Sequence, residues 1–382
     1  MSKELVSFVR KLYKTKEYIP LHEPHLDETD KTQLIKTIDS TFVSSVGTLV
    51  NEFEKKVSEF TGSKYAIAVV NGTAALHLSL DIIGVKEGDE VLTQSLNFVA
   101  STNAIHQCNA SPVFIDVEKE TLGMSPDSLN AFLENECILS DKGCVNKKTK
   151  KIVKACIAMH TFGFPCNIKK IKEICSKYNI KLIEDAAESL GSFLGKKHTG
   201  TYGDLGVFSF NGNKIITTGA GGMIVTNNKD LASLAKHKST TARLEDKWNF
   251  VHDMPAFNYR LPNLNAALGI SQLNKLPLLL EKKRKLAMEY FNWGNENGYR
   301  FKLESIGSTS NYWLNTLITK DSNERDSILQ ITNSSGVMTR PVWIPMHKLK
   351  FNQRFQSVNL TNTNWLSERI VNLPSSAPID AQ

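Results

Sequence analysis

Three short segments of this sequence combine residue types that can carry out chemistry, and each follows a run of apolar residues. Lys214 lies in FSFNGNKIITTGAGG (208–222), in a polar turn beside several glycines. A lysine held in a cleft can lose its proton and form a Schiff base, although most lysines simply lie in solvent. Asp185 lies in IEDAAE (183–188), where a buried carboxylate needs a cation or hydrogen-bond donors, unless it only caps a helix. NGT (71–73) offers backbone N–H groups to a phosphate, or a simple N-cap.

Together the three segments indicate a pyridoxal-phosphate enzyme more strongly than any one of them does. Such an enzyme needs an anion-binding turn for the cofactor phosphate, an acid that keeps the pyridinium nitrogen protonated, and a lysine for the Schiff base. The chain has these parts in the order 71–73, Asp185 and Lys214. We therefore interpret Lys214 and Asp185 as candidate catalytic residues.

Other nucleotide-binding and metal-binding patterns fail on their spacing. GSFLGKK (191–197) is one residue too short between its glycines for a phosphate-binding loop, and it lacks the Ser or Thr that would hold magnesium. No G-x-G-x-x-G follows the first predicted strand, which weakens a nicotinamide-dependent dehydrogenase, the runner-up on fold alone. The six cysteines include no C-x-x-C pair, so we expect buried or idle thiols and no metal site.

Apolar runs alternate with amphipathic stretches from residue 65 onward, and this alternation predicts the elements that position the candidate residues. It indicates an α/β fold with a mostly parallel central sheet flanked by helices on both faces. Such sheets bind ligands at the carboxyl ends of their strands, where the three segments lie. We expect a polar surface loop over 135–151 and a long helix over 264–294, in which the charged run 281–285 (EKKRK) forms a solvated face. Residues from about 300 indicate a smaller α+β domain.

Length and composition are those of a globular protein, because 41% of the 382 residues are hydrophobic and 22% are charged. The length favours two domains, which we place at 1–250 (a large pyridoxal-phosphate-binding domain) and 251–382 (a small C-terminal domain). No stretch suits a membrane helix or a signal peptide, so a cytoplasmic location is the default. The formal charge of +7 suits an anionic small molecule at least as well as nucleic acid, for which no recognition motif is present.

A series of short motifs runs along nearly the whole chain, from about Ile19 to Pro374. They are, in chain order, VVNGTAALHLSL, NFVASTNAI, PVFIDV, MHTFGFP, IEDAAES, GDLGVFSFNGNK, TTGAGGMI, FNYRLPNLNAALG and IPMH. With these motifs in this order, the chain resembles the DegT/DnrJ family of sugar-nucleotide aminotransferases, which are fold-type I pyridoxal-phosphate enzymes. The resemblance implies an aspartate-aminotransferase-like fold with a smaller C-terminal α+β domain.

The resemblance also implies roles for individual residues around pyridoxal 5′-phosphate. Lys214 would form the Schiff base and later move a proton, and Asp185 would pair with the pyridinium nitrogen. Phe98, in NFVAS, would stack on the cofactor ring, although ordinary core packing would give the same pattern. The cofactor phosphate would be held by Gly72, Thr73 and Ser209.

Five further residues are implied around the cofactor and the sugar. Asn258, in FNYR, resembles the residue that reaches the phosphate from a neighbouring subunit, which implies a homodimer with shared active sites. Glu188 stands where the family often has glutamine near the ring hydroxyl, and a carboxylate donates a hydrogen bond only when protonated. The sugar site would draw on Ser44, in DSTFVSSVG, and on His347, for which a structural role fits as well. Arg260 would meet a diphosphate or the cofactor phosphate, or form a salt bridge at an interface.

The chain departs from the family's pattern at two places. Ala220 stands in TTGAGG where many relatives have glutamate, and we expect it to loosen the local hydrogen bonding. The chain ends at Gln382, shortly after NLPSSAPI, where relatives usually continue into a further helix, so we expect a short C-terminus.

The resemblance implies transamination of a nucleotide-linked 4-keto-6-deoxy sugar, with glutamate as the amino donor. IPLHEP, TFVSSVG, QSLNFVA and EDAAES are most similar to the branch that acts on UDP-linked 4-keto-6-deoxy-N-acetylhexosamines, for bacterial surface glycans and for nonulosonic-acid or bacillosamine biosynthesis. A GDP- or dTDP-linked keto sugar is the alternative. A related sugar dehydratase has histidine in place of the Schiff-base lysine, and a non-catalytic relative would lose Lys214 or Asp185. The presence of both residues argues against these two classes.

Overall fold

The apolar runs of the chain form a central sheet with the strand order β1-β11-β10-β7-β6-β2-β3 in the computed structural model, which describes residues 2–45 and 47–378. The bounds of these strands, in chain order, are β1 Tyr65–Val69, β2 Glu90–Gln94, β3 Ser111–Ile115, β6 Val153–Met159, β7 Lys181–Asp185, β10 Leu205–Ser209 and β11 Gly222–Thr226. Strands β10, β7, β6, β2 and β3 pair in parallel, and β11 runs antiparallel to both β1 and β10. The prediction of a mostly parallel sheet is confirmed.

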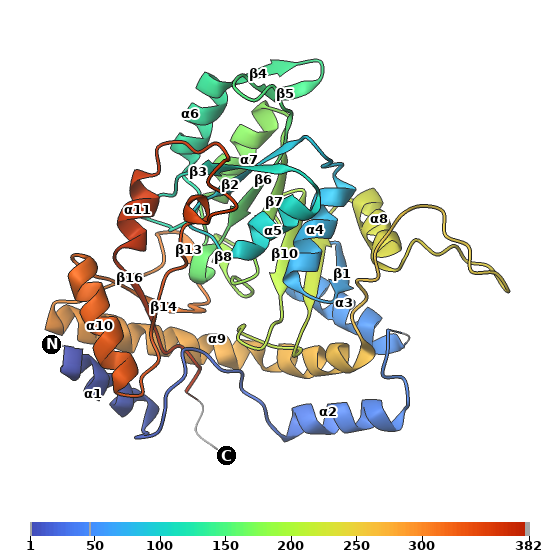
Figure 1. Cartoon of the computed structure of the whole chain (residues 1–382). Helices are drawn as coiled ribbons and strands as arrows, with labels where there is room; N and C mark the ends of the chain where they lie inside the picture. Colours follow the sequence, from blue (N-terminus) through green and yellow to red (C-terminus); the bar gives the residue numbers. More distant parts are fainter. Residues whose placement is uncertain (1, 46, 379–382) are drawn as a thin grey trace.

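Helices cover both faces of the central sheet because side chains alternate along each strand. In β6, Ala155 and Ile157 pack toward one face, whereas Cys156 and Ala158 pack toward the other. The first face carries α4 (Gly72–Ile82), α5 (Val99–Gln107) and α8 (Lys229–Ser239). The second carries α6 (Pro126–Glu136) and α7 (Ile168–Lys177) at one end, and α3 (Thr48–Thr61) and α9 (Asn263–Asn297) at the other (Figure 1). Burial on both faces explains why the strands are continuous apolar runs.

A smaller sheet is built from the C-terminal part of the chain, where the α+β region was predicted. Its order is β12-β14-β16-β15, with bounds β12 Arg300–Phe301, β14 Asn315–Ile318, β15 Arg340–Pro341 and β16 Ile370–Leu373. It packs with α10 (Ser322–Ser334) and with the N-terminal helix α1 (Ser2–Tyr13), and α11 (Thr361–Ser367) precedes β16. The long helix α9 continues through Pro277 and runs along one side of both sheets (Figure 1). The domain boundary at residue 250 stays a prediction.

The segment 135–151 contains a β-hairpin, where the sequence predicted a surface loop. The hairpin pairs β4 (Cys137–Ser140) with β5 (Gly143–Asn146) at the periphery of the molecule. Cys137 and Cys144 are buried beneath it, and the Asn146 amide donates a hydrogen bond to Glu90 over 2.8 Å. These anchors stabilise strand pairing in a segment whose polar composition alone indicates a loop.

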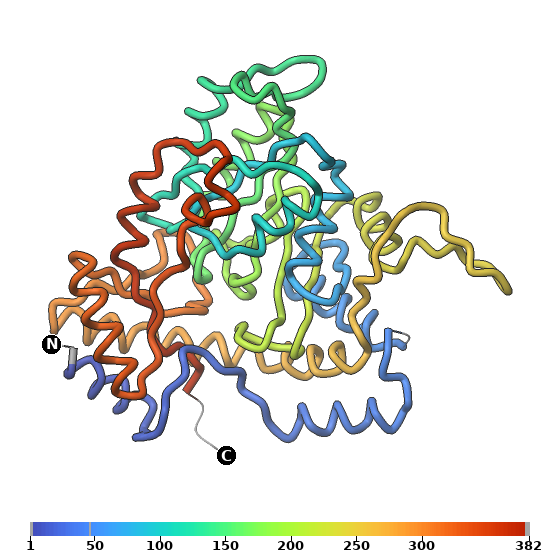
Figure 2. Tube along the Cα trace, viewed as in Figure 1, coloured from blue at the N-terminus to red at the C-terminus, as the bar shows by residue number. Residues whose placement is uncertain are grey.

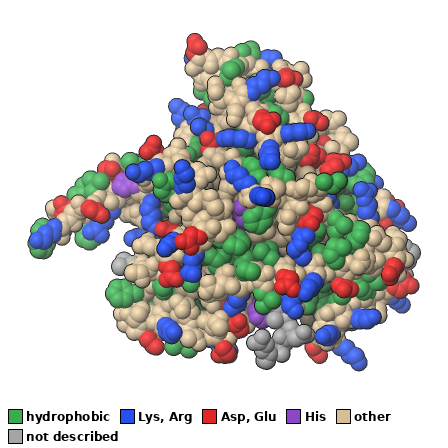
Figure 3. Space-filling model, turned by 180° about the vertical axis from the view of Figure 1, so that it is seen from behind, with side chains coloured by type: hydrophobic (Ala, Val, Ile, Leu, Met, Phe, Trp, Pro, Cys, Tyr) green, Lys and Arg blue, Asp and Glu red, His purple; other side chains and the backbone are tan. Residues whose placement is uncertain are grey.

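The remaining elements are short or peripheral. They are α2 (Glu28–Asp39), η1 (Thr161–Gly163), β8 (Phe193–Leu194), β9 (Lys197–His198), β13 (Ser308–Thr309) and η2 (Met346–Lys348). Residues 241–257, between α8 and α9, project from the body as an arm (Figure 2). On this arm the side chains of Trp248 and Phe250 are 80% and 74% exposed, and the view from behind shows hydrophobic groups along it (Figure 3).

Three further expectations concern membrane-spanning helices, the C-terminus and the cysteines. Within residues 2–45 and 47–378, no helix is both long and apolar enough to span a membrane. The expected short C-terminus falls on residues 379–382, which lie outside the described part of the chain. The six cysteines are free thiols, five of them buried, as expected from their spacing.

Candidate active site

The carboxyl ends of the strands meet around a cavity of about 260 Å³, at the edge of the sheet where the sequence analysis placed the chemistry. β1 leads into the start of α4, β7 ends at Asp185, and β10 ends at Ser209. The cavity brings together most of the residues predicted to contact the cofactor, which are Gly72, Thr73, Phe98, Asp185, Glu188, Ser209 and Lys214.

The start of α4 forms one wall of the cavity and is built to receive an anion. The first N–H groups of a helix have no partner inside the helix, and the helix dipole favours negative charge there. The side chain of Asn71 caps the helix by accepting the N–H of Ala74 over 2.8 Å, so the N-cap and the phosphate explanations both apply. A Cβ atom on Gly72 would lie 3.1 Å from Cβ of Ser209, which shows how closely the helix start approaches β10. This wall therefore fits a phosphate group.

Asp185 lies opposite the helix start and is 3% exposed. Its Oδ2 accepts a hydrogen bond from the Ser101 hydroxyl over 2.7 Å, and its Oδ1 accepts the backbone N–H of Ala187 over 3.2 Å. Burial raises the pKa of Asp185 above its usual range, whereas these two hydrogen bonds act in the opposite direction. A cationic ring nitrogen in the cavity would stabilise the charged carboxylate further, so the site fits a protonated pyridine.

Lys214 points into the same cavity, and its side chain is only 12% exposed. Its Nζ lies 3.4 Å from Oε1 of Glu188 and 4.1 Å from the centroid of the Trp313 ring. Trp313 is itself held, because its Nε1 donates to the carbonyl oxygen of Asn213 over 2.8 Å. These contacts exclude the simple explanation that Lys214 is a solvent-exposed surface lysine.

Glu188 is also buried in the cavity wall, at 3% exposure. Its Oε2 accepts the backbone N–H of Phe162 over 2.8 Å, and burial raises the pKa of Glu188 to about 7. Near neutral pH the carboxyl group is therefore present in both protonation states, and its protonated form is able to donate a hydrogen bond.

Phe98 lies at the cavity with 47% of its surface exposed, so the alternative of ordinary core packing is wrong. Its ring centroid lies 6.0 Å from that of Trp343, which also lines the cavity. The sequence analysis missed Trp343, Trp313 and Ser101. Ser101 lies one helical turn after Phe98 in NFVAS, and Trp343 lies just before IPMH. Their positions in or beside these two motifs could therefore have identified Ser101 and Trp343 as site residues. Trp313 had no comparable signal.

Four residues predicted to bind phosphate or sugar do not line the cavity within this one chain. Asn258 and Arg260 are exposed, and Arg260 Nε donates to Oδ1 of Asn258 over 3.0 Å. Ser44 is exposed, and its carbonyl oxygen accepts the N–H of Asn263 over 2.7 Å. His347 is half-buried, with its Nδ1 2.7 Å from the Ser95 hydroxyl. Their roles stay predictions.

The turn that contains Ala220 is held without the glutamate found in many relatives. The Ala220 carbonyl oxygen accepts hydrogen bonds from the Thr218 hydroxyl over 2.7 Å and from the Asn265 amide over 3.1 Å. The loosening expected from Ala220 stays a prediction.

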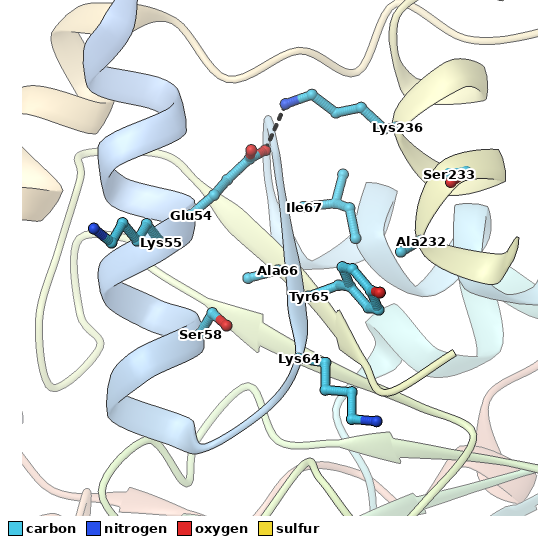
Figure 4. A pocket seen from close by; sticks show the side chains of 10 residues that line it. All are labelled: Glu54, Lys55, Ser58, Lys64, Tyr65, Ala66, Ile67, Ala232, Ser233 and Lys236. Atoms are coloured by element: carbon cyan, nitrogen blue, oxygen red, sulfur yellow. Dashed lines mark hydrogen bonds and ion pairs between the residues drawn. The ribbon is translucent and has the colours of Figure 1, made fainter. Parts of the chain in front are cut away.

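A second hollow of about 440 Å³ lies between α3, β1 and α8 (Figure 4). Glu54 and Lys236 form an ion pair of 2.7 Å at its rim, and Lys55 and Lys64 flank it. It contains none of the residues that the sequence analysis selected, and its Lys236 amine is already paired with Glu54. The smaller cavity at the strand ends is therefore the candidate active site.

Comparison with known proteins agrees with this geometry. A model of the DegT/DnrJ/EryC1/StrS aminotransferase family matches residues 24–381. The GDP-perosamine synthase of Vibrio cholerae is 35% identical over 360 residues, which are 94% of this chain and 94% of that protein. EpsN of Bacillus subtilis (strain 168), provisionally named a pyridoxal phosphate-dependent aminotransferase, is 39% identical over 330 residues, 86% of this chain and 82% of that protein. Among solved structures, the aminotransferase TlmJ from Streptoalloteichus hindustanus has a TM-score of 0.84 at 27% identity, covering 94% of this chain and 93% of that one.

Proposed function

This chain belongs to the DegT/DnrJ/EryC1/StrS aminotransferase family, a family of pyridoxal-phosphate-dependent sugar-nucleotide aminotransferases, and from that premise we propose that it transfers the amino group of glutamate to a nucleotide-linked 4-keto-6-deoxy sugar. One observation carries the proposal. A single cavity at the strand ends is lined by an amine (Lys214), a buried acid (Asp185) and the start of a helix (Gly72). These are the groups that the cofactor aldehyde, ring nitrogen and phosphate require.

Different residues of the cavity would bind different parts of the cofactor. Thr73, Ser209 and the backbone at Gly72 would hold its phosphate, and Phe98 would lie against its ring. Asp185 would keep the ring nitrogen protonated. When bound, pyridoxal phosphate supplies the electron sink for a carbanion.

Lys214 is the residue that would move protons in the reaction. Its Nζ is held between Glu188 and the Trp313 ring inside the cavity where the cofactor would bind. A proton carrier placed in this way typically contributes about 10²–10⁴-fold to the rate.

The nucleotide of the sugar has two candidates. The motifs IPLHEP, TFVSSVG and EDAAES favour a UDP-linked 4-keto-6-deoxy-N-acetylhexosamine. A GDP-linked 4-keto-6-deoxy sugar is the second candidate, supported by the Vibrio cholerae relative that is named GDP-perosamine synthase. In either case Ser44, Arg260 and His347 are the proposed contacts to the sugar nucleotide.

We propose a homodimer with shared active sites. Asn258 and Arg260 lie outside the cavity of their own chain, at the base of the arm formed by residues 241–257. The arm exposes Trp248 and Phe250, and exposed aromatic groups of this size are typical of interaction surfaces. A second copy that buries the arm would bring Asn258 toward the partner's cofactor phosphate.

The test measures both half-reactions on the purified protein. Loaded with pyridoxal phosphate, the protein should show the absorbance band of the bound cofactor, and glutamate should bleach it while 2-oxoglutarate forms. The amine form should then be offered the UDP-linked and the GDP-linked keto sugar separately, with the amino sugar detected by mass spectrometry. A band that glutamate leaves unchanged would contradict the proposed donor, and failure with both sugars would contradict the proposed acceptor.

A further inference from the structure

Glu188 and Lys214 form a buried acid–amine pair inside the cavity. Their side chains are 2% and 12% exposed, and Oε1 of Glu188 lies 3.4 Å from Nζ of Lys214. The carboxyl group cannot turn away freely, because its Oε2 accepts the Phe162 N–H over 2.8 Å. The backbone of Glu188 is fixed as well, since its carbonyl oxygen accepts the Asn311 amide over 2.9 Å. The pair is therefore held in one geometry.

We propose that Glu188 is the proton partner of Lys214, a positioning residue that takes a proton from the amine and returns it. In the forward step an N–H bond of the Lys214 ammonium group breaks and an O–H bond forms on Oε1 of Glu188. No electrons are gained or lost, and the net charge of the pair stays the same. The inference rests on the proposed function, because a neutral Lys214 amine is the form that attacks the cofactor aldehyde.

The chemistry of the carboxyl group separates this role from a purely structural one. A glutamine at position 188 would still accept the Phe162 N–H through its amide oxygen, but it could not accept a proton from Lys214. Burial raises the pKa of Glu188 to about 7, so the carboxyl group is able both to take and to return a proton near neutral pH. Its protonated form can also donate a hydrogen bond.

The other titratable groups around the pair are placed differently. Asp185 bonds to Ser101 and Ala187, and His160, behind it, lies 3.0 Å from Glu184. On the far side of Trp313, the Lys283 amine donates to the Trp313 carbonyl oxygen over 3.1 Å.

His22 also lies beyond Trp313, with ring centroids 6.5 Å apart. Burial, together with Lys283 and Lys214, lowers the pKa of His22 well below its usual range. Within the described part of the chain, the ion pair of Lys214 is with Glu188.

The test follows the capture of pyridoxal phosphate by the apoprotein, without any turnover. The rate at which the absorbance band of the bound cofactor appears is measured against pH for the wild type and for Glu188→Gln. Reductive trapping and peptide mass spectrometry show that the cofactor is on Lys214. The control is Glu118→Gln, which makes the same change at another carboxyl group whose pKa burial raises, outside the cavity.

We expect the wild-type profile to contain a step near pH 7 from Glu188. In Glu188→Gln the step near pH 7 should disappear. The control should match the wild type, because its carboxyl group lies outside the cavity.

A Glu188→Gln profile that overlays the wild type would overturn the proposal, and so would an equal change in the Glu118→Gln control. If Glu188→Gln does not fold, Glu188→Asp is measured instead, because it keeps an ionisable group. Glu188→Asp should retain the step assigned to residue 188, and loss of that step would contradict the proposed role of Glu188. Wild-type protein that captures no cofactor would instead contradict the proposed function, so the two failures are distinguishable.

Discussion

Replacing Ser101 with alanine removes a hydroxyl group that donates to Oδ2 of Asp185 over 2.7 Å inside the protein. The hydroxyl stabilises the charged carboxylate, so its loss favours the protonated form and raises the pKa of Asp185. A hydrogen bond to a charged group contributes about 1.5–3 kcal/mol. Since one pKa unit corresponds to about 1.4 kcal/mol, the pKa should rise by about 1–2 units beyond the increase that burial already causes.

The assay is the pH dependence of kcat/KM for glutamate. If charged Asp185 keeps the cofactor nitrogen protonated, the acid limb of the Ser101→Ala profile should move upward by about 1–2 pH units. The rate at higher pH should approach that of the wild type, because the carboxylate forms there in both proteins.

Ser79→Ala is a matched control for this experiment. Ser79 lies in α4 and is fully buried, but within the described part of the chain its hydroxyl has no hydrogen-bond partner. Its removal should leave the acid limb in place. An acid limb that does not move in Ser101→Ala, or that moves equally in both variants, would refute the assignment of Asp185 and the argument from its hydrogen bond.

Four further predictions follow from the same contacts. Lys214→Ala should abolish transamination while the far-ultraviolet circular dichroism spectrum stays that of the wild type, and appreciable residual turnover would contradict its role. Mixed dimers of Lys214→Ala and Asn258→Ala chains should regain one intact active site, detectable as activity that neither homodimer shows; no recovery would argue against the shared site. Glu184→Gln should lower the urea midpoint, since the carboxylate accepts three backbone N–H groups; the amide oxygen of glutamine can keep the two at Oε1, but its NH2 group would face the Gly200 N–H, and losing that one bond costs about 1.5–3 kcal/mol; an unchanged midpoint would contradict this. Gly222→Ala should weaken cofactor affinity about tenfold by equilibrium dialysis, because a Cβ there would lie 2.4 Å from the Asn71 carbonyl oxygen and overpacking costs about 1–3 kcal/mol; wild-type affinity would show that the turn yields without cost.

The central sheet was predictable because burial on both faces leaves a local signature. Each parallel strand is a short apolar run, and each covering helix has apolar residues at helical spacing. The hairpin at 137–146 had no such signature, because Ile138 and Leu139 are exposed and its buried residues are two isolated cysteines and a polar one, Cys137, Cys144 and Asn146. One buried residue in β4 and two in β5 are too few to separate a hairpin from a loop.

The candidate site divides in the same way, between residues with a local signal and residues brought in by the fold. Asp185 ends β7, and Gly72 and Lys214 lie shortly after β1 and β10, so their place at the sheet edge follows from the topology. Trp313 comes from the segment before β14, about a hundred positions after Lys214, yet it contacts the amine. Only the tertiary packing of this segment near the ends of the central strands creates that contact, and no local pattern encodes it.

The burial of Lys283 could have been predicted from the spacing of its apolar neighbours, but not from the charged composition of its segment. The run 281–285 was interpreted as a solvated helix face, which is wrong for Lys283, since it is 1% exposed. Leu279 and Leu286 are buried four residues before it and three after it, which is the spacing of one helix face. The amine donates to the carbonyl oxygens of Trp313 and Ser375, and burial lowers the pKa of Lys283 to about 7. A basic run thus contains the residue that ties α9 to the backbone of the tryptophan beside Lys214.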